Sequence, residues 1–206
     1  MTLPLRITFI RIFMSPVFLA LYLYGRECGI SLLTSTCLLL SILFLCELSD
    51  IFDGLLARSH NKVTEIGKIL DPMADSIFRL SVFLSFTQEP VKIPLFVVLI
   101  FFLRDSVITT LRTICALQGI TLAARMSGKI KAIVQALVAF LILVAMLFYA
   151  QDSISSLFFQ KFSYYAASFA ALYTLISGVE YLWSHWKLFT NLLKKNLTLP
   201  KSDLRG

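Results

Sequence analysis

The chain has 206 residues, of which 58% are hydrophobic and only 15% are charged. One water-soluble core of ordinary size cannot bury so much apolar surface, which excludes a typical soluble domain and favours a membrane protein. The formal net charge is +7. No soluble module is recognisable that would hold nucleic acid, so the basic residues are interpreted as facing anionic lipid headgroups and phosphates.

Six apolar segments follow one another along the chain. Each is long enough to cross the roughly 30 Å hydrocarbon core of a bilayer, which needs about 20 helical residues. The predicted helices cover residues 5–24, 31–57, 68–87, 91–116, 130–150 and 162–183. No small-residue cleavage site follows the first segment, which is therefore interpreted as a retained helix and not as a signal peptide. The sequence predicts an all-α polytopic membrane protein with six transmembrane helices.

Basic residues are distributed unevenly between the two ends of these helices. Outside the helix interiors, only Arg26, Lys92 and Lys161 lie at one set of ends, and the other lysines and arginines lie at the opposite set. Short loops rich in these residues stay on the cytoplasmic side of a membrane. Both termini are therefore predicted to be cytoplasmic.

Tryptophans mark the end of the last apolar segment. Trp183 and Trp186, followed by lysines, are predicted to lie in an interfacial belt that leads to a short surface helix. Residues 1–186 are expected to form one six-helix domain, and residues 187–206 a basic cytoplasmic tail. His185 has no neighbouring residue that would make it a metal ligand, and is interpreted as a surface residue.

Four aspartates lie near the cytoplasmic ends of the predicted second and third helices. Asp50 and Asp53 share one helix face, and Asp71 and Asp75 share another. The short loop between these helices makes them antiparallel neighbours, so the four carboxylates are expected to meet at one depth. Four anions in a partly desolvated pocket need cations. Because the ligands are all oxygen, hard ions such as Mg²⁺ or Mn²⁺ are expected.

Small and basic residues surround these aspartates. Gly54 and Ala57 remove side-chain bulk, which lets a ligand approach the backbone. Arg58 adds a cation that can bind phosphate oxygens, and Gly67 lies in a first turn whose N–H groups favour an anion. Together these features predict a diphosphate site. The alternative, in which the aspartates cap helices or pair with loop cations, would suit one such residue better than four.

The complete pattern is Asp-x2-Asp-Gly-x2-Ala-Arg-x8-Gly-x3-Asp-x3-Asp. It is filled by Asp50, Asp53, Gly54, Ala57, Arg58, Gly67, Asp71 and Asp75. This pattern resembles the signature of the CDP-alcohol phosphatidyltransferases. The resemblance implies a six-helix membrane enzyme, usually a homodimer, that transfers the phosphatidyl group of a CDP-linked lipid to an alcohol and releases CMP. It also implies that the four aspartates hold two divalent metal ions at the diphosphate, and that Asp75 is the catalytic base.

Basic residues in the second half of the chain concern the acceptor alcohol. Arg104 and Arg112 are eight residues apart in the predicted fourth helix, and Lys129 and Lys131 open the fifth. An arginine halfway along a spanning helix needs an anionic partner. Four inward-facing cations beside an acidic metal site therefore predict an acceptor that carries its own phosphate.

The same stretch resembles one branch of the family, the phosphatidylglycerophosphate synthases, which carry an Arg-acid-x6-Arg segment before a Gly-Lys-x-Lys segment. The implied donor is CDP-diacylglycerol and the implied acceptor is sn-glycerol 3-phosphate. By position, the acceptor phosphate would be held by Arg104, Arg112, Lys129 and Lys131. The chain departs from the branch at Leu5, where asparagine is usual, and at Ser76, where lysine is usual.

Two other charged residues lie near the aspartates. Arg79 could supply the missing lysine's charge, or it could form an ion pair with Asp75 one helical turn away. Glu47 lies one turn before the first aspartate. It is interpreted as a protonated acid and not as a partner of the site.

Two alternative functions stay open. A sister enzyme could use inositol 1-phosphate, serine or phosphatidylglycerol as acceptor, although the four cations disfavour an uncharged one. A cation transporter could use the aspartates as an ion site, but such sites lie near the bilayer midplane between broken helices. The sequence favours a phosphatidyltransferase of a bacterial-type inner (cytoplasmic) membrane, with its active site facing the cytoplasm.

Overall fold

The computed structural model describes the backbone of residues 3–60, 65–117 and 126–197, and the side chains of residues 9–49, 73–115 and 126–186. Within these ranges the regular structure is entirely helical. The helices are α1 (Leu3–Tyr24), α2 (Leu32–His60), α3 (Glu65–Ser85), α4 (Leu95–Leu117), α5 (Met126–Ala150) and α6 (Ser156–Leu197). The predicted all-α fold is confirmed, and each predicted helix corresponds to one observed helix.

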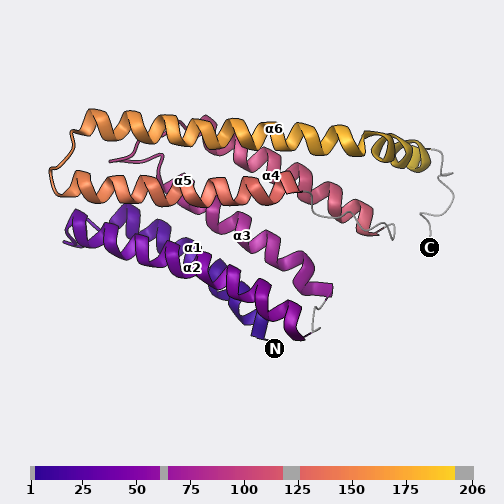
Figure 1. Cartoon of the computed structure of the whole chain (residues 1–206), viewed down its shortest axis with the longest axis horizontal. Helices are drawn as coiled ribbons and strands as arrows, with labels where there is room; N and C mark the ends of the chain where they lie inside the picture. The colour runs from indigo at the N-terminus through magenta and orange to yellow at the C-terminus, as the bar shows by residue number, and fades with distance from the viewer. Residues whose placement is uncertain (1–2, 61–64, 118–125, 198–206) are drawn as a thin grey trace.

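The helices run alternately in opposite directions along the length of the molecule (Figure 1). The α1–α2, α3–α4 and α5–α6 connections lie toward the left of that view, and both chain ends lie away from them. Helix α1 packs on α2 and α3, α5 packs on α2 and α6, and α4 packs on α3 and α6. This arrangement brings the start of α5 and the later halves of α4 and α6 toward the end of the molecule that carries the chain termini.

The described connections contain residues that start or end helices. Gly29, between α1 and α2, has a φ of 78°, a left-handed conformation that glycine adopts without steric cost. The hydroxyl of Ser31 accepts a hydrogen bond of 3.1 Å from the N–H of Thr34, which caps α2. Helix α4 begins at Leu95 and not at residue 91 as predicted, because Pro90 and Pro94 interrupt the segment before it.

Helix α6 is longer than the sequence analysis predicted. It runs from Ser156 to Leu197 without a break, so the separate surface helix expected after Trp186 is instead the last part of α6. Neither glycine nor proline occurs between Gly178 and Pro200, and nothing in that stretch interrupts helical hydrogen bonding. The division into a domain and a tail at residue 186 stays a prediction.

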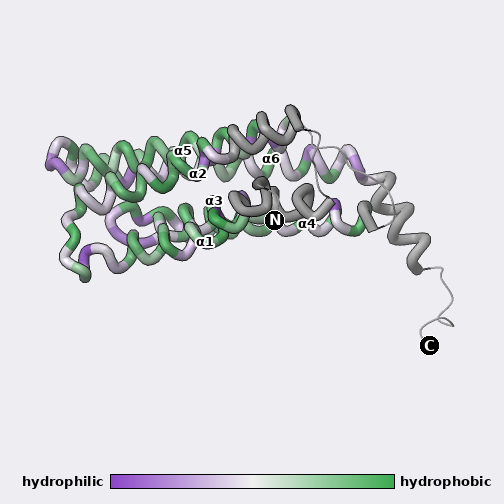
Figure 2. The backbone as a smooth tube through the Cα atoms, turned by 90° about the horizontal axis from the view of Figure 1, so that it is seen from below, coloured by the Kyte–Doolittle hydropathy of each residue, from purple (hydrophilic) through white to green (hydrophobic). Residues whose placement is uncertain are grey.

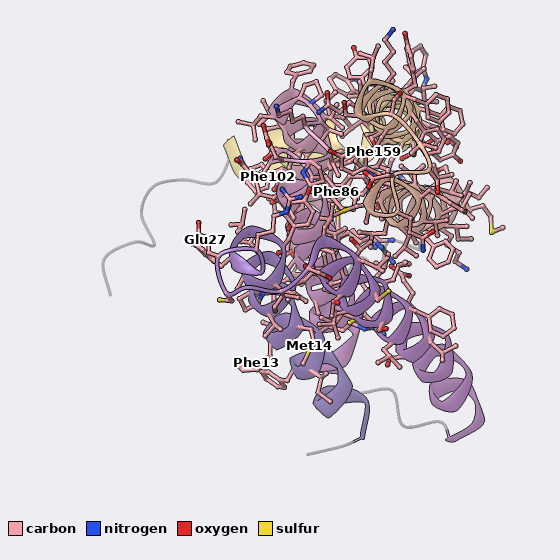
Figure 3. All side chains as sticks on the ribbon, turned by 90° about the vertical axis from the view of Figure 1, so that its left-hand side faces the viewer. Phe13, Met14, Glu27, Phe86, Phe102 and Phe159 are labelled. Carbon is pink, nitrogen blue, oxygen red and sulfur yellow. The ribbon has the colours of Figure 1, made fainter. Side chains whose placement is uncertain are left out.

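Aromatic side chains fill the core between the helices. Among the residues whose side chains are described, the fully buried aromatic ones are Phe18, Phe83, Phe86, Phe101 and Phe159. The rings of Phe83 and Phe101 lie 4.6 Å apart between centroids, which joins α3 to α4. In Figure 3, Phe86 and Phe159 lie between helices whereas Phe13 lies on the outside. This core holds the helices on which the candidate site residues lie.

Large apolar side chains also cover the outer surface. Phe13, Phe96 and Tyr165 are 67%, 68% and 68% exposed, and hydrophobic residues predominate along most of the helices in Figure 2. Such a surface is unfavourable in water and suits contact with lipid. Three described segments are long and apolar enough to cross a bilayer: Leu32–Ser49, Met126–Ala150 and Ser156–Trp186. Six spans and cytoplasmic termini stay predictions.

Candidate active site

A cavity of about 280 Å³ lies between α3, α4, α5 and α6. Its charged lining residues are Asp75, Arg79, Arg104, Asp105, Arg112, Lys129 and Lys131. The structure therefore brings the predicted catalytic base and all four predicted acceptor-phosphate ligands to one cavity. The lining carries more cations than carboxylates, so the cavity favours an anionic ligand.

The other motif residues lie where α2 ends and α3 begins. Their side chains fall outside the described residues: Asp50, Asp53, Gly54, Ala57, Arg58, Gly67 and Asp71. The side chains that the structure does describe hold no group of three or more possible metal ligands. The proposed roles of these seven residues in metal and CDP-lipid binding thus stay predictions.

Asp75 contacts an arginine that the motif does not contain. Nη1 of Arg11, on α1, donates a hydrogen bond to Oδ1 of Asp75 on α3. Arg11 is only 4% exposed, and its carbonyl accepts a hydrogen bond of 3.0 Å from the hydroxyl of Ser15. No role in the site was predicted for Arg11 from the sequence. The sequence did contain a signal for a buried contact of Arg11, because a basic residue inside an apolar helix needs an anionic partner.

Glu47 and Arg79 connect α2 to α3 beside Asp75. Nε of Arg79 lies 3.4 Å from Oε1 of Glu47, and both residues line a small cavity together with Arg11 and Asp75. The expectation that Glu47 is not a partner of the site is therefore wrong, because the guanidinium of Arg79 faces its carboxyl group. The contact shows that Glu47, midway along α2, reaches α3 beside Asp75.

Asp105 is the anionic partner of two of the four predicted acceptor cations. Nζ of Lys131 donates to its two carboxylate oxygens at 2.8 and 2.9 Å, and Nη1 of Arg104 donates to Oδ1 at 3.1 Å. A substrate phosphate was predicted as the anionic partner of Arg104, whereas the carboxylate of Asp105, the next residue in the chain, already fills this role. Lys129 has no ion pair with any described residue, and it faces the cavity at the start of α5.

Helix α6 supplies a polar wall that the sequence analysis missed. The hydroxyl of Ser177 accepts a hydrogen bond of 3.3 Å from Nη2 of Arg104, and the guanidinium of Arg112 lies 5.9 Å from the ring centroid of Tyr181. A Cβ atom on Gly178 would lie 3.0 Å from Cγ of Arg104, so the glycine leaves room for the arginine. A serine and a tyrosine four residues apart in an apolar helix were the available signal.

An all-helical chain with an apolar outer surface and a charged cavity is typical of a membrane enzyme that acts on anionic substrates. Residues 1–182 match the family model of the CDP-alcohol phosphatidyltransferases. The chain belongs to this family and is a phosphatidyltransferase, which confirms the resemblance seen in the sequence.

Relatives within the family cover different shares of the chain. The CDP-diacylglycerol–glycerol-3-phosphate 3-phosphatidyltransferase of Bacillus subtilis (strain 168) is 32% identical over 191 residues, which are 90% of this chain and 95% of the relative. A probable phosphatidylglycerophosphate synthase of Mycobacterium tuberculosis is 30% identical over 137 residues, 63% of this chain and 60% of the relative. A cardiolipin synthase (CMP-forming) of Streptomyces coelicolor is 32% identical over 80 residues, 39% of this chain and 37% of the relative.

Proposed function

We propose that the protein transfers the phosphatidyl group of CDP-diacylglycerol to sn-glycerol 3-phosphate, which forms phosphatidylglycerophosphate and releases CMP. The observation that carries this proposal is that Arg104, Arg112, Lys129 and Lys131 line one cavity with Asp75. An acceptor with its own phosphate would match the excess positive charge of this cavity. The name of the Bacillus subtilis relative, whose sequence this chain covers almost completely, supports the same acceptor.

The diphosphate of the donor would lie between the end of α2 and the start of α3. The four aspartates offer only carboxylate oxygens, which fit Mg²⁺ or Mn²⁺. The 3.4 Å contact between Glu47 and Arg79 joins α2 to α3 beside Asp75. Asp50, Asp53, Asp71 and Asp75 would hold two such ions. When bound, the ions would offset the charge of the diphosphate and of the departing CMP.

The remaining motif residues would bind the CDP-lipid. Gly54, Ala57 and Gly67 would leave space for the diphosphate beside the backbone. Arg58 would bind phosphate oxygens through two parallel N–H groups.

Asp75 would act as the base for the acceptor. Its carboxylate would take the proton of the acceptor hydroxyl while that oxygen forms a bond to the phosphorus next to diacylglycerol. The bond between this phosphorus and the oxygen of the CMP phosphate breaks, and CMP leaves. The hydrogen bond from Arg11 would hold the Asp75 carboxylate toward the acceptor hydroxyl.

We further propose that the protein is a homodimer in the inner (cytoplasmic) membrane with its active site facing the cytoplasm. The uneven distribution of lysine and arginine supports this orientation. The resemblance to the family supports the dimer.

One observation favours a second candidate acceptor, phosphatidylglycerol. An apolar groove of about 320 Å³ between α4 and α6 shares Arg104 and Ile108 with the charged cavity. A lipid acceptor could place its phosphate near Arg104 and an acyl chain in this groove. The similarity of this chain to the cardiolipin synthase of Streptomyces coelicolor, which extends over only 80 residues, also supports this second candidate.

The two candidates are separated by the lipid that the protein makes. Purified protein with Mg²⁺ and CDP-diacylglycerol would be offered sn-glycerol 3-phosphate, phosphatidylglycerol, inositol 1-phosphate or serine, and products would be identified by mass spectrometry. We expect CMP and phosphatidylglycerophosphate with sn-glycerol 3-phosphate. Cardiolipin as the main product would establish the second candidate and overturn the first.

A further inference from the structure

We propose that the hydroxyl of Tyr181 binds the phosphate of the acceptor, so that α6 forms part of the acceptor site. This inference rests on the proposed function. Tyr181 lines the charged cavity and is 3% exposed. Its hydroxyl is buried and has no hydrogen-bond partner among the described residues. A buried polar group without a partner is costly, and a ligand that fills the cavity would supply one.

Neighbouring side chains hold the Tyr181 ring in place. The guanidinium of Arg112 lies 5.9 Å from the ring centroid, and the imidazole centroid of His185 lies 4.5 Å from it with an angle of 30° between the rings. Nδ1 of His185 also lies 2.9 Å from the carbonyl oxygen of Tyr181. His185, which is partly exposed, thus also packs against the cavity wall. A ring held in this way keeps its hydroxyl at a fixed position.

The hydroxyl of Ser177, one helical turn before Tyr181, differs from the Tyr181 hydroxyl in its hydrogen bonding. The Ser177 hydroxyl donates to the carbonyl of Thr174 at 3.2 Å and accepts from Nη2 of Arg104 at 3.3 Å. Both of its hydrogen-bonding roles are therefore used within the chain. The Tyr181 ring packs against the guanidinium of Arg112, but neither hydrogen-bonding role of its hydroxyl is used by a described residue.

The neighbouring arginine indicates which ligand group would bind there. Nε of Arg112 is also buried without a hydrogen-bond partner among the residues described. An N–H donor and an O–H donor on adjacent side chains suit one anionic oxygen, because a phosphate oxygen accepts several hydrogen bonds. We therefore assign the phosphate of the acceptor, and not the CDP-lipid, to this pair.

The test replaces Tyr181 with phenylalanine, which removes the hydroxyl and keeps the ring. The matched control is Tyr165→Phe, on the same helix, where the side chain is 68% exposed and outside the cavity. We expect Tyr181→Phe to raise the KM for sn-glycerol 3-phosphate about tenfold, the effect of losing one hydrogen bond to a charged group. The KM for CDP-diacylglycerol should stay within about twofold, and the control should match the unmodified protein.

A binding measurement separates this effect from misfolding. The unfolding temperature of Tyr181→Phe without ligand should equal or exceed that of the unmodified protein, because no hydrogen bond within the chain is lost. The rise in unfolding temperature that sn-glycerol 3-phosphate produces should be smaller in the variant.

The possible failures are distinguishable. If the unmodified protein makes phosphatidylglycerophosphate but Tyr181→Phe leaves both KM values unchanged, or raises both equally, the assignment of Tyr181 is wrong and the proposed function stands. A rise confined to CDP-diacylglycerol would also overturn the assignment. If the unmodified protein makes no lipid from sn-glycerol 3-phosphate, the proposed function and this inference are both wrong.

Discussion

At the scale of single residues, the contact between Arg11 and Asp75 is the main addition to the sequence motif. Asp75 is the last of the four aspartates and the proposed base, and Arg11 reaches it from a helix that carries none of the motif. The hydrogen bond from Arg11 restricts the orientation of the Asp75 carboxylate. The proposed base, Asp75, would thus depend on a contact from α1 as well as on the motif residues of α2 and α3.

Arg11→Gln should therefore lower kcat more than it raises either KM. We expect a loss of at least about tenfold in kcat, because a misplaced base weakens proton transfer in the transition state. Arg11→Lys keeps the charge and should recover part of the loss. The measurement is CMP release at saturating concentrations of both substrates. A kcat of Arg11→Gln equal to that of the unmodified protein would show that the contact between Arg11 and Asp75 does not contribute to turnover.

At the scale of helices, Asp105 joins α4 to α5. It accepts hydrogen bonds from Lys131 at 2.8 and 2.9 Å, and both residues are almost completely buried. Removing one partner of a buried ion pair leaves an uncompensated charge. The pair is therefore expected to stabilise the helix packing as well as to place Lys131 at the cavity.

Asp105→Asn should destabilise the protein by on the order of 3 kcal/mol. Thermal unfolding in detergent would show a lower midpoint. Asp152→Asn is a suitable control, because Asp152 lies in the exposed turn between α5 and α6. An unfolding midpoint for Asp105→Asn equal to that of the control would contradict a stabilising role for the pair.

At the scale of the whole molecule, the helices and the acidic motif could be predicted from the sequence because both depend on local patterns. Apolar runs define the helices, and spacing within one helix places Asp71 and Asp75 on one face. The contacts that Arg11 and Tyr181 make with other helices were not predicted. A helix that is apolar on all sides has no polar face that reveals its rotation, so nothing local showed that Arg11 faces Asp75 or that Tyr181 faces Arg112.

Metal dependence would also be a property of the whole site, since the proposed metal ligands lie on two helices. A chelator in excess should abolish CMP release, and added Mg²⁺ should restore it, because the diphosphate charge would otherwise be unscreened. Asp71→Asn should stay inactive at every Mg²⁺ concentration. Turnover by the chelated protein, or by Asp71→Asn, would remove the metal assignment.

The ion pairs of Asp105 have one further consequence. Lys131 and Arg104 have long side chains with many rotamers. Immobilising one such side chain when a ligand binds costs about 0.5–1.5 kcal/mol of free energy. Because Asp105 already restricts both, that loss of conformational entropy occurs once, when the protein folds. A small soluble ligand therefore meets a preorganised receptor in every catalytic cycle.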